Sequence, residues 1–171
     1  MVAESMGPDG DLVAARLARG CRCFAVLVDG ALGGYGWLST GPEWIGEIQL
    51  EIAPGPAEGY VWNCFTVAEH RRKGIFRSLI TGIAAAGRRD GLRRIWIGSV
   101  EMPAERALEP AGFQAVLHAH STIKEGMCWL KVTVPETAEP SLVESARAVL
   151  GIGGRPLAVA TTLRRSSPRR H

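Results

Sequence analysis

The sequence lacks a long apolar segment. It has no run of about 18 uncharged apolar residues, which a membrane-spanning helix requires. Its first ten residues also lack the basic and then apolar pattern of a secretory signal. We therefore expect a cytoplasmic protein with no membrane partner.

Cysteine is scarce, and its spacing is not that of a metal site. The four cysteines are Cys21, Cys23, Cys64 and Cys128, with no second pair and no histidine at zinc-ligand spacing. We expect reduced thiols and no bound metal.

Excess charge of one sign is also lacking over most of the chain. The net charge is +3, and residues 1–135 contain 14 Lys or Arg and 14 Asp or Glu. Residues 136–171 contain six Lys or Arg and three Asp or Glu, so the excess positive charge belongs to this tail. A neutral body disfavours a nucleic-acid partner, although the arginines of the tail leave that alternative open.

The 171 residues, of which 46% are hydrophobic, suffice for one domain with a core.

Asp29-Gly30 between two apolar runs predicts a hairpin, and the run from Ile75 has helical periodicity. A strand over 47–52, with alternating polar and apolar residues, is expected to pair with the next strand in a four-stranded meander. The predicted elements are helices over 11–19, 75–89, 103–109 and 141–150, and strands over 24–28, 31–39, 47–52, 60–67, 94–98, 113–118 and 127–134. The order predicts a mixed α/β domain, and the last ten residues are expected to be disordered.

The most informative segment is a basic turn between a strand and a helix. Unpaired amides at a helix N-terminus can hold a phosphate, and Gly74 lets such a ligand approach the backbone. Four cationic side chains surround this point: Arg71, Arg72, Lys73 and Arg77. The segment therefore predicts a site for a phosphorylated cofactor, whereas a solvated basic loop is the alternative reading.

Two motifs in this order resemble the GNAT superfamily of acyl-CoA-dependent N-acyltransferases. Residues 71–76, Arg-Arg-Lys-Gly-Ile-Phe, are similar to its pyrophosphate turn, Gln/Arg-x-x-Gly-x-Gly/Ala, with Phe76 at a position usually held by Gly or Ala. Residues 104–113 are similar to its helix that ends in Ala-Gly-Phe. The resemblance covers residues 24–134, about two thirds of the chain.

The resemblance implies a GNAT-like α/β (mixed α+β) fold. In this fold, helices flank a central, mostly antiparallel twisted sheet of six to seven strands, and here the N-terminal part is shortened. We expect a short helical segment over residues 1–20, the acyltransferase domain over 21–135, and a flexible basic extension over 136–171.

The resemblance also implies a co-substrate, acetyl-CoA or another acyl-CoA. Strand residues Phe65, Thr66 and Val67 would hold the pantetheine and polarise the thioester, and Ile75 and Phe76 belong to the pyrophosphate turn. The acceptor would be an amine of a small molecule or of a protein or peptide. A homodimer is compatible with this reading.

The catalytic groups are less defined. The position at which the family often has a general-acid tyrosine is Leu108, so this role stays unassigned. Glu101, where the family often has asparagine, could act as a base or cap a helix, and Glu47 and Glu51 could act as bases or face solvent. Cys64 could be a covalent nucleophile, but a packed thiol is the preferred reading.

One further alternative follows from the departures from the family pattern. Leu108 and Phe76 favour a catalytically degenerate domain that binds acyl-CoA as a sensor or binds a partner. An enzyme would consume acyl-CoA, whereas a sensor would bind it without turnover.

Overall fold

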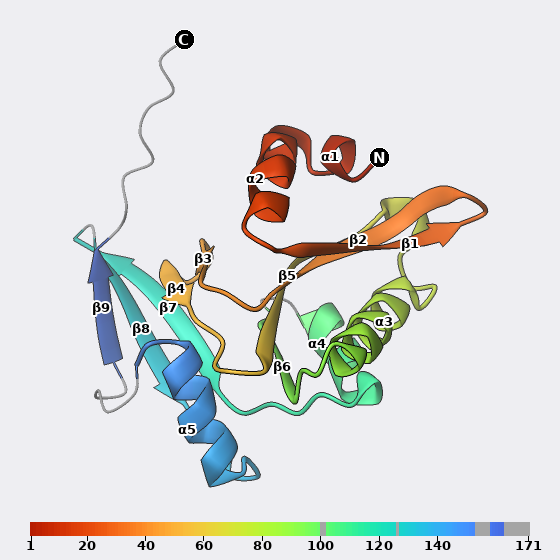
Figure 1. Cartoon of the computed structure of the whole chain (residues 1–171). Coiled ribbons are helices and arrows are strands. Elements are labelled where there is room, and N and C mark those ends of the chain that lie inside the picture. The colour runs from red at the N-terminus through yellow and green to blue at the C-terminus, as the bar shows by residue number, and fades with distance from the viewer. Residues whose placement is uncertain (100–101, 126, 153–157, 163–171) are drawn as a thin grey trace. The chain divides into compact units, whose positions relative to one another are not determined.

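The computed structural model describes residues 1–99, 102–125, 127–152 and 158–162 (Figure 1). The chain divides into two compact units. The first comprises Met1–Pro42 and Pro54–Gln114, and the second comprises Glu43–Ala53 and Ala115–His171. The predicted mixed α/β class is confirmed. The described residues form nine strands in sheets of four, two and three, whereas one central sheet of six to seven strands was expected.

The first unit is built on a four-stranded sheet. Its strands, in the order β1-β2-β5-β6, are β1 (Arg22–Val28), β2 (Ala31–Ser39), β5 (Glu58–Thr66) and β6 (Arg94–Ile97). The pairs β1–β2 and β2–β5 are antiparallel, and β5–β6 is parallel. The predicted hairpin is confirmed, because β1 and β2 join through Asp29 and Gly30, which have φ angles of 51° and 82°. Positive φ at both positions is typical of a two-residue hairpin turn.

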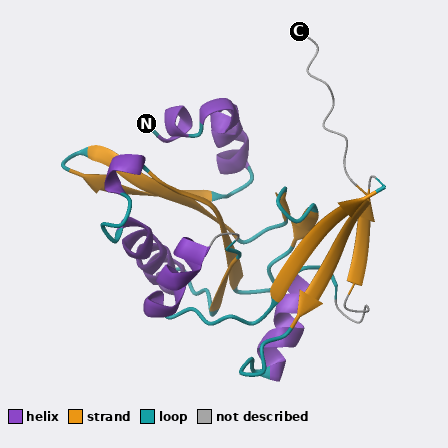
Figure 2. Ribbon diagram, turned by 180° about the vertical axis from the view of Figure 1, so that it is seen from behind, coloured by secondary structure: helices purple, strands orange, loops and turns teal. Residues whose placement is uncertain are grey.

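Helices cover both faces of this sheet (Figure 2). The predicted central helix is α3 (Ile75–Arg89), whose Leu79, Ile80 and Ile83 are buried in a cluster with Leu38 and Val61. On the other face lie α1 (Val2–Ser5), the 3-10 helix η1 (Gly7–Asp11) and α2 (Leu12–Ala18), over a second cluster. That cluster contains Met6, Cys21, Tyr35 and Trp37.

Three short helices complete the first unit. They are η2 (Ala68–His70), α4 (Met102–Leu108) and η3 (Glu109–Ala111). The last two agree with the helix predicted over 103–109, and Gly112 follows with a φ of 88°.

The second unit contains two small sheets and one helix. Strands β3 (Glu43–Ile45) and β4 (Leu50–Ile52) pair with each other. Strands β7 (His118–Lys124), β8 (Met127–Thr133) and β9 (Ala158–Thr162) form an antiparallel sheet in that order. The helix predicted over 141–150 is confirmed as α5 (Pro140–Val149). Leu130, Val132 and Ile152 form the core of this unit.

Two predicted strands are wrong in extent or pairing. The strand over 47–52 is reduced to β4 because Gln49, with a φ of 51°, forms a turn in which its amide donates to Gly46 O. It pairs with β3, and β5 pairs with β2, so the four-stranded meander is wrong. Residues 113–117 form no strand, and β7 begins at His118.

The C-terminal expectations are met in part. The strand predicted over 127–134 is β8, and Thr162 belongs to β9. Residues 163–171, the remainder of the stretch expected to be disordered, lie outside the described residues.

Candidate functional site

The basic turn after β5 has two residues in the left-handed region. Arg71 is extended, with φ −63° and ψ 152°, whereas Arg72 and Gly74 have φ angles of 61° and 79°. Gly74 is the N-cap residue of α3, and a Cβ added to it would meet no atom within 4 Å. The space next to the start of α3 is therefore open.

The first amides of α3 have no acceptor in the helix. The first helical bond is donated by Ser78 N to Gly74 O, at 2.9 Å, and no side chain caps the N-terminus. Helix geometry therefore leaves the N–H groups of Ile75, Phe76 and Arg77 without helical partners, at the positive end of the helix dipole. This end of α3 is suited to an anion.

Cationic side chains surround this helix end. Arg71, Arg72, Lys73 and Arg77 are all exposed, and none of them takes part in an ion pair among the described residues. Arg71 Nε donates to the carbonyl oxygen of Thr66, at 3.3 Å. The turn thus presents four unneutralised charges beside the open amides.

Phe76 does not occupy this space. Its ring packs against the core cluster under α3, so its side chain is directed into the unit. The first turn of α3 also lies close to β2, since Ile75 Cγ2 is 3.0 Å from the position that a Cβ on Gly34 would occupy. Phe76 and Ile75 therefore anchor the helix end.

The strand that leads into the turn has a free edge. Strand β5 pairs with β6 only over Glu58–Val61. Of its last five residues, Trp62, Phe65 and Thr66 pair with β2, and among the described residues none of the five pairs on the other side. The β2–β5 register shifts by one residue between Tyr35 and Trp37, and Asn63, in the bulge, has a φ of 47°. This bulge bends β5 where its free edge begins.

Backbone direction alternates along this edge. Val67 N donates to Gly33 O at 3.0 Å, so the amide of Val67 points toward β2. Because an antiparallel ladder alternates, the backbone groups of Phe65 also point toward β2, and those of Thr66 point away from it. The Phe65 ring packs against that of Tyr35, at a centroid distance of 5.6 Å.

The candidate catalytic carboxylates are not among the described residues of the first unit, which contains the basic turn and β5. Glu47 and Glu51 are exposed residues of the second unit: Glu47 O accepts a hydrogen bond from Ser121 Oγ, and Glu51 lies opposite Trp44. Glu101 lies outside the described residues. Leu108 packs against the core under α3, so an apolar contact holds the position of the usual tyrosine.

Cys64 is a packed thiol. Burial raises the pKa of Cys64 to about 12, and its Sγ lies 3.8 Å from the carbonyl oxygen of Trp62. The side chain packs against the core cluster under α3. A thiol in this environment is a poor nucleophile at neutral pH.

Sequence reasoning missed Arg16 and Asn63. Arg16 is only 9% exposed, and its Nη1 donates to Asn63 Oδ1 at 2.9 Å. Its guanidinium also lies over two indole rings, at 5.1 Å from Trp37 and 5.7 Å from Trp62. Arg16 stands in a short helix of ordinary composition, so no sequence signal separated it from a surface arginine.

Two kinds of feature are lacking among the described residues. No group of three or more His, Cys, Asp or Glu side chains in this part of the chain is arranged to hold a metal ion. No helix in the same ranges is long and apolar enough to cross a membrane.

Comparison with known proteins links the fold to one family. The model of the acetyltransferase (GNAT) family matches residues 4–113, well over half of the chain. A putative acetyltransferase from Agrobacterium tumefaciens has a similar structure, with 16% identity, a TM-score of 0.50, and coverage of 70% of this chain and 79% of that chain. No curated protein matches.

Two further solved structures are similar at lower scores. A ribosomal-protein-alanine N-acetyltransferase from Brucella melitensis has 22% identity and a TM-score of 0.47, and covers 66% of this chain and 78% of its own. An aminoglycoside N-acetyltransferase in complex with CoA has 16% identity and a TM-score of 0.48, with coverages of 66% and 81%.

Proposed function

The chain belongs to the GNAT acetyltransferase family, and we propose that it transfers an acetyl group from acetyl-CoA to an amine by direct attack. The observation that carries this proposal is the open N-terminus of α3, with four exposed and unpaired cations, next to the free edge of β5. Membership of the family supports acyl transfer in general. The acetyl donor and the amine acceptor, whether small molecule, peptide or protein, are part of the proposal.

The pyrophosphate of the coenzyme would bind at the start of α3. Its negative charges would accept hydrogen bonds from the amides of Ile75, Phe76 and Arg77, and Gly74 leaves the approach open. Arg72 and Lys73 would add positive potential. Phe76, packed in the core, is compatible with this binding.

The pantetheine would lie along the free edge of β5. We assign its backbone contact to the amide of Thr66, which points away from β2, because the amide of Val67 already donates to Gly33 and Thr66 O already accepts from Arg71. The bulge at Asn63 would bring the thioester to the end of the paired part of the strand.

The reaction would need no covalent enzyme intermediate. The nitrogen of a neutral amine would attack the thioester carbonyl, the C–S bond would break, and CoA would leave as a thiolate that is then protonated. The amine gives up one proton to a base, for which Glu47, Glu51 and Glu101 stay the proposed candidates. A packed Cys64 supports direct transfer.

The test is calorimetric titration of acetyl-CoA into the full chain and into Gly74→Asp. A carboxylate about 4–6 Å from the pyrophosphate costs about 1 kcal/mol in a water-like environment and more where the ligand excludes water. We expect affinity to fall by about 10- to 1000-fold. Because Gly74 has a φ of 79°, aspartate is strained at this position, and the free protein should lose about 1 kcal/mol of stability.

Two control variants separate charge from backbone strain. Gly74→Asn has nearly the same size and also tolerates positive φ but is neutral, so its affinity should stay within a few-fold of the wild type. Gly91→Asp places the carboxylate at a second open glycine, with a φ of 84°, just beyond the other end of α3. Unchanged affinity in Gly74→Asp, or equal loss in Gly74→Asn, would refute the anion site. Binding without turnover of any amine would favour the sensor alternative.

A further inference from the structure

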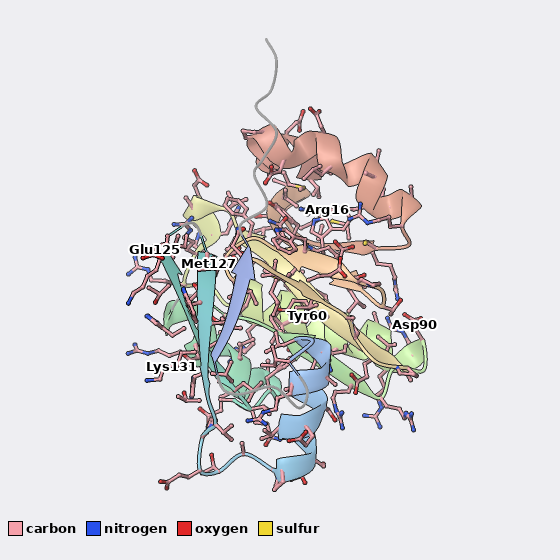
Figure 3. The ribbon with its side chains drawn as sticks, turned by 90° about the vertical axis from the view of Figure 1, so that its left-hand side faces the viewer. Arg16, Tyr60, Asp90, Glu125, Met127 and Lys131 are labelled. Carbon is pink, nitrogen blue, oxygen red and sulfur yellow. The ribbon has the colours of Figure 1, made fainter. Side chains whose placement is uncertain are left out.

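A buried positive charge without a negative partner lies on the face of the sheet opposite α3. Arg16, labelled in Figure 3, extends from α2 toward β2 and β5 and is 9% exposed. None of the ion pairs among the described residues includes Arg16. A buried cation of this kind usually has a carboxylate partner, because desolvation of the charge is costly.

Arg16 makes one hydrogen bond within the described residues, and its other guanidinium nitrogens are not fully buried, so they are open to solvent or to a ligand. A guanidinium has five N–H groups, and the one side-chain acceptor for them among the described residues is Asn63 Oδ1. The two indole rings stabilise the charge through their faces but accept no conventional hydrogen bond. The indole Nε1 of Trp37, fully buried beneath the guanidinium, also has no acceptor in the described part of the chain. The site therefore has a surplus of donors.

Asn63 places these hydrogen-bond donors where a ligand can reach them. Arginine can only donate, so the atom of Asn63 at 2.9 Å from Nη1 is the carbonyl oxygen, and Nδ2 is left as a second donor. Asn63 is exposed, it has positive φ, and it lies in the bulge at the free edge of β5. An oxyanion that approaches this edge would meet the Asn63 amide and the Arg16 guanidinium together.

We propose that Arg16 and Asn63 form a receptor for a carboxylate of the acceptor substrate, so that the preferred acceptors are amines that also carry a carboxylate, such as amino acids. This inference rests on the proposed acetyl transfer for the reaction itself, but not for the binding of the carboxylate. The carboxylate supplies the counter-charge that Arg16 lacks and accepts from Asn63 Nδ2. The same contact orients the amine at the point where the thioester would lie.

The main variant is Asn63→Asp. It places a carboxylate within hydrogen-bond distance of Arg16, so an internal anion occupies the receptor, and aspartate tolerates the positive φ of this position. Arg16→Gln removes the charge but keeps donors. The matched control is Arg22→Gln, since Arg22 also stacks on an aromatic ring, that of Phe24 at 4.9 Å, but already pairs with Asp90.

The readout is the ratio of kcat/KM for an amino acid to that for its carboxamide, each divided by the fraction of neutral amine at the assay pH, because the two amines differ in pKa. The panel includes glycine and glycinamide, lysine and lysinamide. One charge-assisted bidentate contact predicts a ratio of about 10 to 100 in the wild type. We expect the ratio to fall to about 1 in Asn63→Asp and Arg16→Gln and to persist in Arg22→Gln. A wild-type ratio of 1 or less, or a ratio that Asn63→Asp leaves unchanged, would overturn the proposal.

A second measurement needs no turnover. N-acetylglycine and N-acetylglycinamide are titrated into each protein by calorimetry in the presence of CoA. Tighter binding of the carboxylate to the wild type, lost in Asn63→Asp, would support the receptor even if no amine were acetylated and the proposed function therefore failed. Equal binding of the two compounds would overturn it. Thermal denaturation shows whether each variant is folded, and Asn63→Asp should melt no lower than the wild type.

Discussion

The buried thiol of Cys64 gives a quantitative prediction about reactivity. Burial raises the pKa of Cys64 from 9.0 to about 12. At pH 7 the thiolate fraction is then about 10⁻⁵, against about 10⁻² for a thiol with its ordinary pKa. Since the thiolate is the reactive form, Cys64 in the folded protein should be alkylated about 1000-fold more slowly than in the unfolded chain.

The assay is alkylation by iodoacetamide at pH 7, followed by mass spectrometry of the peptide that contains Cys64. The same protein unfolded in urea gives the reference rate. The rate for the folded protein should rise about tenfold for each pH unit and continue to rise beyond pH 10. Alkylation of folded Cys64 within tenfold of the unfolded rate would refute the reasoning.

The same shift makes a prediction about stability. Because the pKa of Cys64 is raised on folding, the neutral thiol is favoured in the native state. Its contribution to the free energy of unfolding is complete below about pH 9 and is lost as the pH rises to about 12. The urea midpoint should therefore fall over this window more for the wild type than for Cys64→Ala. Cys64→Ala should also keep kcat within a few-fold, since direct transfer needs no thiol.

Two further predictions concern glycines near α3. Gly82→Ala should raise the free energy of unfolding by up to about 1 kcal/mol, because alanine favours the helix and its Cβ would meet no atom within 4 Å. Gly87→Ala should lower it, since the Cβ would lie 2.7 Å from Ile95 Cδ1, and urea denaturation of the two variants compares the signs directly. In Gly34→Ala the Cβ would lie 2.7 Å from the carbonyl oxygen of Phe65, so the end of β5 must shift. Calorimetry should show at least a tenfold loss of acetyl-CoA affinity, and unchanged affinity would contradict this expectation.

The parts of the fold with strong local signals could be predicted from the sequence. Asp29-Gly30 forms a hairpin turn because both residues tolerate positive φ. Helix α3 is amphipathic: it buries a regular apolar stripe and exposes its polar side. The basic turn could be placed for the same reason, because its residues are consecutive. These features depend on few long-range contacts.

Features that depend on distant partners could not be predicted. Strand β7 is exposed at most positions, so it carries almost no apolar signal, and it is defined by its register with β8. The alternation of polar and apolar residues over 47–52 predicts a strand that pairs with β5. The turn at Gln49 shortens this strand to β4, which pairs with β3. Arg16 and Asn63 are 47 residues apart, and only the folded sheet brings them together.

The interleaving of the two units also determines when each can be completed during synthesis. All residues of the first unit have been synthesised once the chain reaches Gln114, but Ile48 and Leu50 pack against Leu130 and Val132 in the second. The amide of Ala53 also donates to the carbonyl of Val149, almost a hundred residues later. Until that late segment leaves the ribosome, the apolar side chains of residues 43–53 lack the residues against which they pack. Aggregation or chaperone binding often begins at apolar segments that are exposed in this way. A chain that stops before residue 127 would keep this segment exposed permanently.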